Sequence, residues 1–312
     1  LMVMVRMRFI NSYSIWASVV ISLCSATTTL ALETPDAESS PCGSGFGQAL
    51  SLGPSHGNDA SNLWMAAKPN KIWGAENVEL ASERSGDFLR ARFPEGSINP
   101  RNKHAPRGGM GFRLPVTSSK QEVCLRYRVR FPDGFAFARG GKLPGLYGGN
   151  GPTGGAKDRS GGFSARLMWT AKGVGVLYLY APGQQVKWGE GLGRGRFTFS
   201  TGRWIEVAQH LIPGPRGKLR LFIDGVQVVE VGPRALPTPR EAGLLVSTFF
   251  GGNSPSWRSP RDQHIDFASF TVWLANKDRL APHTGARRPK VSSEQIRRRW
   301  SVSVSRLFGI WR

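Results

Sequence analysis

Short runs of alternating apolar and polar residues, separated by glycine and proline, recur along most of this chain. The clearest is LFIDGVQVVE, where Asp224-Gly225 stands between two apolar runs, a strong signal for a β-hairpin. Glycine and proline supply 39 and 21 of the 312 residues, and almost no segment has the apolar period of a helix. The pattern predicts an all-β fold, a β-sandwich, with strands near 78–80, 88–93, 111–114, 123–131, 163–169, 175–180, 196–199, 204–211, 218–223, 226–231, 244–250 and 264–273.

Residues 163–180 predict two strands that share a polar face. Side chains alternate between the two faces of a strand, so Ser164 and Arg166 share one face of FSARLMW. By the same rule Tyr178 and Tyr180 share one face of GVLYLY. An ordinary solvated sheet face is the plainer interpretation of such a pattern.

The connection between these strands decides which polar residues face each other. If residues 171–173 form a three-residue hairpin loop with Gly173 in the left-handed conformation, Thr170 pairs with Val174. The arginine then stands opposite the first tyrosine of YLY, and the serine stands opposite the second. The sequence therefore predicts one polar patch, made of Ser164, Arg166, Tyr178 and Tyr180.

The preceding segment GGKLPGLYGG favours a functional site over a solvated face. Its glycines let the backbone approach a ligand closely, and ordering such a segment costs conformational entropy. Lys142 adds a charge beside the polar patch, and Tyr147 adds another phenol.

Several motifs in and around this region are similar to those of a known enzyme family. They span roughly Leu89 to Trp273 and comprise FPDGF (131–135), GGKLPGL (140–146), the FSARLMW and YLY strands, GRWIEV (202–207), LRLFIDG (219–225) and STFFGG (247–252). On these motifs the chain resembles polysaccharide lyase family 14 and the related glucuronan lyases, which are β-jelly-roll enzymes acting on alginate and other polyuronates. The resemblance implies a β-sandwich of jelly-roll type. It also implies a catalytic set, matched here by Lys142, Ser164, Arg166, Tyr178 and Tyr180.

A polyuronate lyase works by β-elimination, which removes the C5 proton beside the sugar carboxylate and expels the oxygen on C4. Enolate charge develops on the carboxyl group, and Arg166 or Lys142 is suited to stabilise it. Tyr178 and Tyr180 are the candidate base and acid, in either order, because a phenol flanked by Lys and Arg is easier to ionise. Ser164 is expected to orient the substrate or a tyrosine.

Two other classes of function are weaker matches. A glycoside hydrolase needs paired carboxylates at its cleft, and no cluster such as Glu-x-Asp-x-x-Glu is present in the sequence. A non-catalytic module that binds acidic polysaccharide needs no phenols at special positions, so the complete catalytic set argues against it without excluding it.

The net charge of +21 indicates a polyanionic partner. Nucleic acid and acidic polysaccharide both qualify, but no RNA-binding or helix-turn-helix pattern is evident, which favours the polysaccharide. Arg101 and Arg107, from the turn-rich segment 94–111, are candidate substrate-binding residues, with a basic surface loop as the alternative. Two further candidates are Tyr147 and Arg128, the latter from a stripe of three arginines in VCLRYRVRF that is either a solvated face or part of an anion-binding cleft.

The two ends of the chain differ from its middle. Residues 1–32 are typical of a secretory signal peptide, with arginines, an apolar run and small residues in that order. A membrane anchor is the alternative, but the apolar run is short for spanning a bilayer. Residues 33–62 predict a flexible leader, residues 63–281 the lyase domain, and residues 282–312 a basic, disordered tail, for which an amphipathic membrane-surface helix is the alternative. We therefore expect a secreted, extracellular monomer with no stable membrane insertion.

The cysteines of an exported chain predict one disulfide. Cys24 leaves with the signal peptide, so Cys42 and Cys124 have one possible pairing, with two buried thiols as the alternative. The five histidines are isolated and stand at no ligand spacing. We expect neither a metal nor a cofactor.

Overall fold

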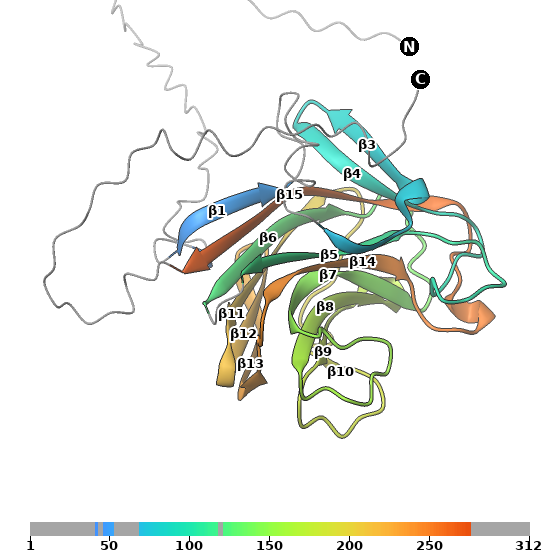
Figure 1. Ribbon diagram of the computed structural model, residues 1–312. Helices are drawn as coiled ribbons and strands as arrows, with labels where there is room; N and C mark the ends of the chain where they lie inside the picture. The colour runs from blue at the N-terminus through green and yellow to red at the C-terminus, as the bar shows by residue number, and fades with distance from the viewer. Residues whose placement is uncertain (1–40, 43–45, 53–68, 118–120, 276–312) are drawn as a thin grey trace, which may run out of the picture. The chain divides into compact units, whose positions relative to one another are not determined.

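The computed structural model describes residues 41–42, 46–52, 69–117 and 121–275, which form two antiparallel β-sheets packed against each other (Figure 1). Sheet A has the strand order β13-β12-β11-β6-β15-β4-β3, and β1 also pairs with β15. Sheet B has the order β10-β9-β8-β7-β14-β5-β2. The predicted all-β sandwich is confirmed.

The strands of sheet A are β1 (Phe46–Leu52), β3 (Val78–Glu83), β4 (Gly86–Phe93), β6 (Val123–Arg130), β11 (Trp204–Ile212), β12 (Gly214–Ile223), β13 (Val226–Leu236) and β15 (Gln263–Ala275). Those of sheet B are β2 (Asn70–Trp73), β5 (Met110–Thr117), β7 (Gly140–Gly149), β8 (Gly162–Thr170), β9 (Gly175–Tyr180), β10 (Glu190–Leu192) and β14 (Ala242–Phe250). Three short 3-10 turns complete the described elements: η1 (Ala75–Asn77), η2 (Ala171–Gly173) and η3 (Pro255–Trp257).

The core lies between the two sheets, where their inward side chains meet. In β6, Tyr127 and Val129 are fully buried, whereas the arginines that alternate with them point away from the core. Aromatic rings fill the core around Trp169 of sheet B, with the rings of Phe131 and Phe250 centred 5.7 and 5.4 Å from it. This packing of sheet A against sheet B leaves the outer face of sheet B free to carry a site.

Part of the segment predicted as a flexible leader is a strand. β1 pairs with residues 270–275, the half of β15 that lies beyond its pairing with β4 at residues 263–267. Without β1, the backbone groups along that edge of β15 would lack strand partners. The leader prediction is therefore wrong for residues 46–52.

The predicted disulfide is confirmed. Cys42 is bonded to Cys124 of β6, with the two Cα atoms 5.5 Å apart. The predicted signal peptide at 1–32 and the basic tail at 282–312 lie outside the described residues. Within the described ranges, the structure holds no helix of the length and apolar character that crossing a membrane requires.

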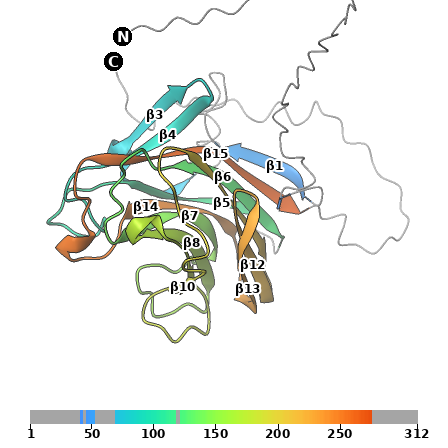
Figure 2. The same ribbon diagram turned by 180° about the vertical axis from the view of Figure 1, so that it is seen from behind.

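Two loops meet beside the end of sheet B that carries β10. The 150–161 loop connects β7 to β8, and the 181–189 loop connects β9 to β10. Both views of the fold place these loops together (Figures 1 and 2). They lie next to the hairpin that carries the polar patch.

Candidate active site

The predicted hairpin of β8 and β9 is confirmed. Arg166 faces Tyr178 and Ser164 faces Tyr180, in the register expected from strand alternation and a three-residue loop. Gly173 of that loop has a φ of +75°, the left-handed conformation for which glycine is suited. The polar patch is therefore one contiguous surface on the outer face of sheet B.

A row of directly opposed residues crosses sheet B on this face. The row runs through Gly191, Tyr178, Arg166, Gly145, Leu245, Arg113 and Asn70. Opposed residues of an antiparallel sheet share a face, so the polar patch and the outer side chains of β14, β5 and β2 belong to one surface. Arg166 extends past the bare backbone of Gly145 and donates from Nη1 to the hydroxyl of Ser247 on β14 at 3.2 Å.

Lys142 of β7 lies beside the polar patch and is nearly buried, with 9% of its surface exposed. Its Nζ is 4.3 Å from the ring centroid of Tyr178 and 3.0 Å from the sulfur of Met168. Burial, and to a smaller extent the like charge of Arg166, lower the pKa of Lys142 well below its ordinary value of 10.5. The amine is thus poised to lose its proton more readily than a surface lysine.

Replacing this buried lysine with methionine is expected to stabilise the fold. Lys142→Met fills a similar volume and avoids a buried amine, so the free energy of unfolding at neutral pH should rise by on the order of 1 kcal/mol. Because the pKa of Lys142 is lowered in the folded state, the unfolded chain binds the proton more readily between the lowered pKa and 10.5, and wild-type stability rises with pH across that interval. The advantage of the variant should therefore shrink as the pH approaches 10.5.

Urea denaturation of wild type and Lys142→Met, at neutral pH and at stepwise higher pH, measures this difference. An advantage that stays constant as the pH rises would contradict the burial of a titrating amine. A less stable variant at every pH would contradict it as well.

The two tyrosines of the polar patch hold their hydroxyls next to each other. The phenol oxygens of Tyr178 and Tyr180 are 3.5 Å apart. The Gly189 N–H donates to Tyr178 and the Gly155 N–H donates to Tyr180, each at 3.0 Å. Each phenol oxygen thus accepts a backbone hydrogen bond from a different loop.

At Tyr178, the easing effect expected from a neighbouring cation is outweighed by burial. Burial, followed by its hydrogen bond to Tyr180, raises the pKa of Tyr178 above the ordinary value of 10. The attraction of Arg166 acts in the opposite direction but is the weaker effect. Tyr178 therefore keeps its proton at neutral pH.

Arg159 fastens together the two loops that cover the tyrosines. Its guanidinium donates to the side chain of Gln184 at 3.0 Å and to the Val186 carbonyl at 2.8 Å, which ties the 150–161 loop to the 181–189 loop. It also lies 4.9 Å from the ring centroid of Tyr180. Only 7% of its surface is exposed. No sequence pattern pointed to this residue, because its partners are backbone and side-chain groups of a second loop.

Arg166, the cation of the polar patch, is buried, with 4% of its surface exposed. Burial, together with the like charges of Arg113 and Arg101, lowers the pKa of Arg166 from 12.5 to about 10. Its Nε has no hydrogen-bond partner among the described residues. Guanidinium groups that converge in this way, with an unused donor, are suited to receive an anion.

Ser164 contacts the covering loop rather than a tyrosine hydroxyl. Its hydroxyl donates to the Pro152 carbonyl at 2.6 Å, and the residue is fully buried. This hydrogen bond holds the 150–161 loop against β8.

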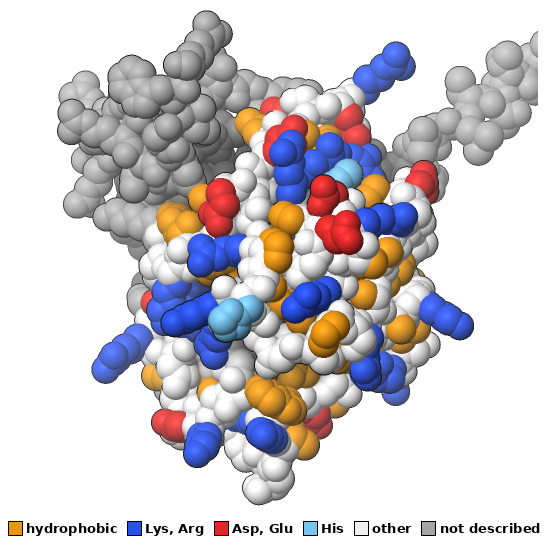
Figure 3. All heavy atoms as spheres, turned by 90° about the vertical axis from the view of Figure 1, so that its right-hand side faces the viewer, with side chains coloured by type: hydrophobic (Ala, Val, Ile, Leu, Met, Phe, Trp, Pro, Cys, Tyr) orange, Lys and Arg blue, Asp and Glu red, His pale blue; other side chains and the backbone are white. Residues whose placement is uncertain are grey.

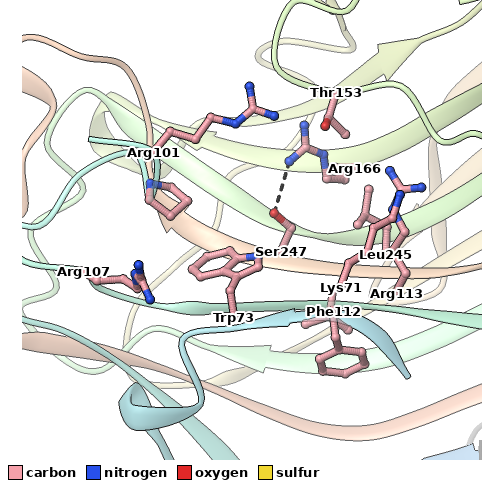
Figure 4. Close-up of a pocket in the computed structure, with 12 residues that line it drawn as sticks. Lys71, Trp73, Arg101, Arg107, Phe112, Arg113, Thr153, Arg166, Leu245 and Ser247 are labelled. Atoms are coloured by element: carbon pink, nitrogen blue, oxygen red, sulfur yellow. Dashed lines mark hydrogen bonds between the residues drawn. The ribbon is translucent and has the colours of Figure 1, made fainter. Parts of the chain in front are cut away.

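A cleft of about 400 Å³ opens next to Arg166 on the same face (Figure 4). Its twelve lining residues include five cations and no acidic side chain: Lys71, Trp73, Pro100, Arg101, Arg107, Phe112, Arg113, Thr153, Arg166, Leu245, Val246 and Ser247. Arg101 and Arg107, two of the predicted substrate-binding residues, are among them. Lys71, Trp73 and Arg113 were not predicted. They lie on β2 and β5, which reach the cleft only because β5 pairs with the distant strand β14.

The structure does not bring the other two predicted substrate-binding residues to this cleft. Tyr147 is fully buried, and its hydroxyl donates to the Glu241 carboxylate at 2.8 Å. Arg128 belongs to sheet A, where its guanidinium lies 5.3 Å from the ring centroid of Trp204. Its arginine stripe therefore lies on the outer face of the opposite sheet, which is the solvated-face alternative. A metal site with three or more His, Cys, Asp or Glu ligands is not found among the described residues.

A family model for polysaccharide lyase 14 matches residues 81–270, which is more than half of the chain. The chain belongs to this family. It is similar to the marine PL-14 alginate lyase from Aplysia kurodai, with 28% identity, a TM-score of 0.61, and coverage of 74% of this chain and 100% of that one. The alginate lyase vAL-1 from a Chlorella virus shares the fold at 21% identity, with a TM-score of 0.58 and coverage of 68% and 96% of the two chains. A comparison with curated proteins finds no match.

Membership of polysaccharide lyase 14 agrees with the fold described above. The predicted β-sandwich of jelly-roll type is confirmed by the match to a solved member along its whole length. The protein is accordingly a polysaccharide lyase.

Proposed function

We propose that this polysaccharide lyase cleaves an acidic polyuronate, either alginate or glucuronan, by β-elimination. The observation that carries the proposal is the position of Arg166, which joins a cleft lined by five cations to a pair of hydrogen-bonded tyrosines and a buried lysine. A polyuronate carries one carboxylate on every sugar, so a cleft lined by five cations complements its charge. The 28% identical relative is named an alginate lyase, which supports the same class of substrate.

The carboxylate of the reacting sugar is proposed to bind Arg166. Loss of the C5 proton moves negative charge onto this carboxylate, so a fixed guanidinium stabilises the transition state more than the ground state. The unused Nε of Arg166 and the nearby cation Arg113 strengthen this stabilising field. Arg107 and Lys71 extend it along the cleft.

Proton transfer is proposed to involve Lys142 and the two tyrosines. The lowered pKa of Lys142 makes its amine a suitable base for the C5 proton. The raised pKa of Tyr178 keeps a proton available for the departing C4 oxygen. In the balanced step the base gains the C5 proton, a C4–C5 double bond forms, the C4–O bond breaks, and the leaving oxygen takes the phenol proton. Tyr180 supports this transfer through its contact with Tyr178, and Ser164 is a positioning residue.

The two alternative functions have less support. A glycoside hydrolase places two carboxylates at its cleft, whereas none of the described residues that line this one is acidic. A purely binding module would not need a buried amine and paired phenols, which cost stability to maintain. Family membership also favours an enzyme.

We further propose that the protein is secreted and acts as an extracellular monomer. The residues at 1–32 have the order of a signal peptide, and the Cys42–Cys124 disulfide is typical of an oxidising compartment. Expression of the full chain, followed by mass measurement of the protein in the medium, tests both the secretion and the cleavage.

The proposed reaction has a direct assay. The purified enzyme is incubated separately with polymannuronate, polyguluronate, glucuronan and a neutral β-1,4-glucan, and the ultraviolet absorbance of the C4–C5 double bond is followed. At least one polyuronate should give a rising absorbance, and the neutral glucan should give none. Chain shortening without a rise in absorbance would indicate hydrolysis and overturn the proposal.

The cationic cleft predicts a strong dependence of substrate binding on salt. Lys and Arg cover far more of the exposed face in Figure 3 than Asp and Glu do. Between about 0.1 M and about 1 M salt the screening length falls from about 10 Å to about 3 Å, so KM should rise several-fold. Initial rates across this range measure it, and a KM that does not change with salt would count against electrostatic binding.

A further inference from the structure

The cleft contains an aromatic side chain that the roles above leave unused. Trp73 is the last residue of β2, the edge strand of sheet B, and it lines the cleft while remaining half-buried. In Figure 4 its indole lies between Arg107 on one side and the Arg166–Ser247 pair on the other. The ring also packs edge-on against Phe249, with the centroids 6.1 Å apart, so packing is the alternative to a role in binding.

The indole of Trp73 lies against bare backbone. Its partner in the β2–β5 register is Gly111, and a Cβ built on that glycine would come within 2.7 Å of the indole Cζ2. Only glycine therefore leaves room for the ring to lie on the sheet. One ring face is supported by Gly111, and the ring also lines the cleft.

Trp73 belongs to the same surface as the polar patch. Ser247, Gly111 and Trp73 are successive partners across β14, β5 and β2. Two strand spacings, roughly 10 Å, separate Trp73 from the serine that receives the Arg166 hydrogen bond. A saccharide chain that crosses the strands from the tyrosines would therefore pass Arg166 and then reach Trp73.

The chain departs from regular strand geometry at this place. The β2–β5 register advances from Asn70–Arg113 to Trp73–Gly111, so β2 contains one extra residue. Within it, Lys71 has a φ of +54°, which is uncommon for a residue other than glycine. Both Lys71 and Trp73 line the cleft. Bulges of this kind re-aim side chains next to active sites.

The charges around the indole match an acidic ligand. Arg101 and Arg107 are exposed side chains of the 94–111 segment, and Arg107 has an ion pair of 3.6 Å with the exposed Glu76. The guanidinium of Arg101 lies near Gly154, so a Cβ on that glycine would be 3.0 Å from its Nη1. Arg101 thus reaches across the cleft from the 94–111 segment to the 150–161 loop.

We infer that Trp73 is the platform of a separate uronate-binding subsite, at which a sugar ring of the polyuronate stacks on the indole and its carboxylate meets Arg101 and Arg107. The inference rests on the proposed function, since it places a second sugar of the same substrate. Stacking uses the C–H face of the sugar ring, and the guanidinium groups select for a carboxylate. The subsite sits beyond Arg166, so it contributes to holding the polymer and leaves the chemical step to the polar patch.

Loss of the subsite is expected to raise KM and to leave kcat unchanged. Trp73→Ala should raise KM for the polymer by about 3- to 10-fold, as expected for loss of one aromatic contact, while kcat stays near the wild-type value. Trp73→Phe should restore most of the loss. Arg101→Gln, an exposed and therefore fold-neutral change, should raise KM in the same direction. Trp273→Ala, at a tryptophan of sheet A that packs under Arg126, is the matched control and should leave KM unchanged.

A binding measurement separates this inference from the proposed function. Saturated tetra-uronate is titrated by calorimetry into wild type, Trp73→Ala, Arg101→Gln and Trp273→Ala under conditions without turnover. Weaker binding by Trp73→Ala and Arg101→Gln, with wild-type affinity in Trp273→Ala, supports the subsite. This result would hold even if no tested polyuronate is cleaved. Unchanged binding by Trp73→Ala, or a fall in kcat with KM intact, would overturn it.

Discussion

Removing the hydroxyl of Tyr178 is expected to lower kcat by roughly 10²- to 10⁴-fold, the range typical of general acid–base catalysis. Tyr178→Phe keeps the ring against which Lys142 packs, with Nζ 4.3 Å from its centroid, and deletes the hydroxyl that we propose supplies the proton. Tyr180→Phe should be impaired as well, because its hydroxyl lies 3.5 Å from that of Tyr178. Each change also leaves one backbone N–H, of Gly189 or Gly155, without its phenol acceptor.

Steady-state kinetics on the preferred polyuronate, with circular dichroism to verify folding, measures these effects. Tyr127→Phe is the matched control, since it removes a phenol that donates to the Pro144 carbonyl in the core and lies away from the cleft. It should keep a kcat near the wild-type value. Folded Tyr178→Phe and Tyr180→Phe enzymes with wild-type rates would show that the polar patch is not the catalytic site.

The hairpin that carries these tyrosines was predictable because its information is local. Period-two alternation assigns the faces of each strand, and a three-residue loop with a left-handed glycine sets the register. Arg166 opposite Tyr178 follows from these two facts alone, and the structure has this pairing. The Asp224-Gly225 turn was equally clear, and β12 and β13 pair on either side of it.

The remaining features of the site depend on contacts between distant segments. The burial of Lys142, which lowers its pKa, comes from neighbours on β8 and β9. The cover over the phenols comes from loops tied together by Arg159. Alternation placed Arg128 on a polar face, but a period of two does not tell which of two sheets a strand joins. In the structure β6 belongs to sheet A, away from the cleft.

Changing the buried arginine of the polar patch to lysine is expected to reduce kcat/KM by roughly 10²- to 10³-fold, the cost typical of losing one transition-state donor. Lysine lacks the planar fork that grips a carboxylate in two places. It would also lose its charge, because Arg166 is buried and faces the like charges of Arg113 and Arg101. The neighbouring Lys142 shows what this environment does, since burial lowers its pKa well below 10.5. Arg166→Lys is therefore a change of both geometry and charge.

The pH dependence separates these two losses in Arg166→Lys. A lysine at this site regains its charge as the pH falls, so the activity deficit caused by lost charge should narrow toward low pH, whereas the deficit caused by lost geometry should persist. Arg220→Lys on sheet A, whose side chain pairs with Glu230 at 2.9 Å, is the control and should match wild type at every pH. Rates measured against pH for the three proteins test this. An Arg166→Lys enzyme with near wild-type kcat/KM would mean that the carboxylate of the reacting sugar binds elsewhere in the cleft, where Arg101 and Arg113 are further cations.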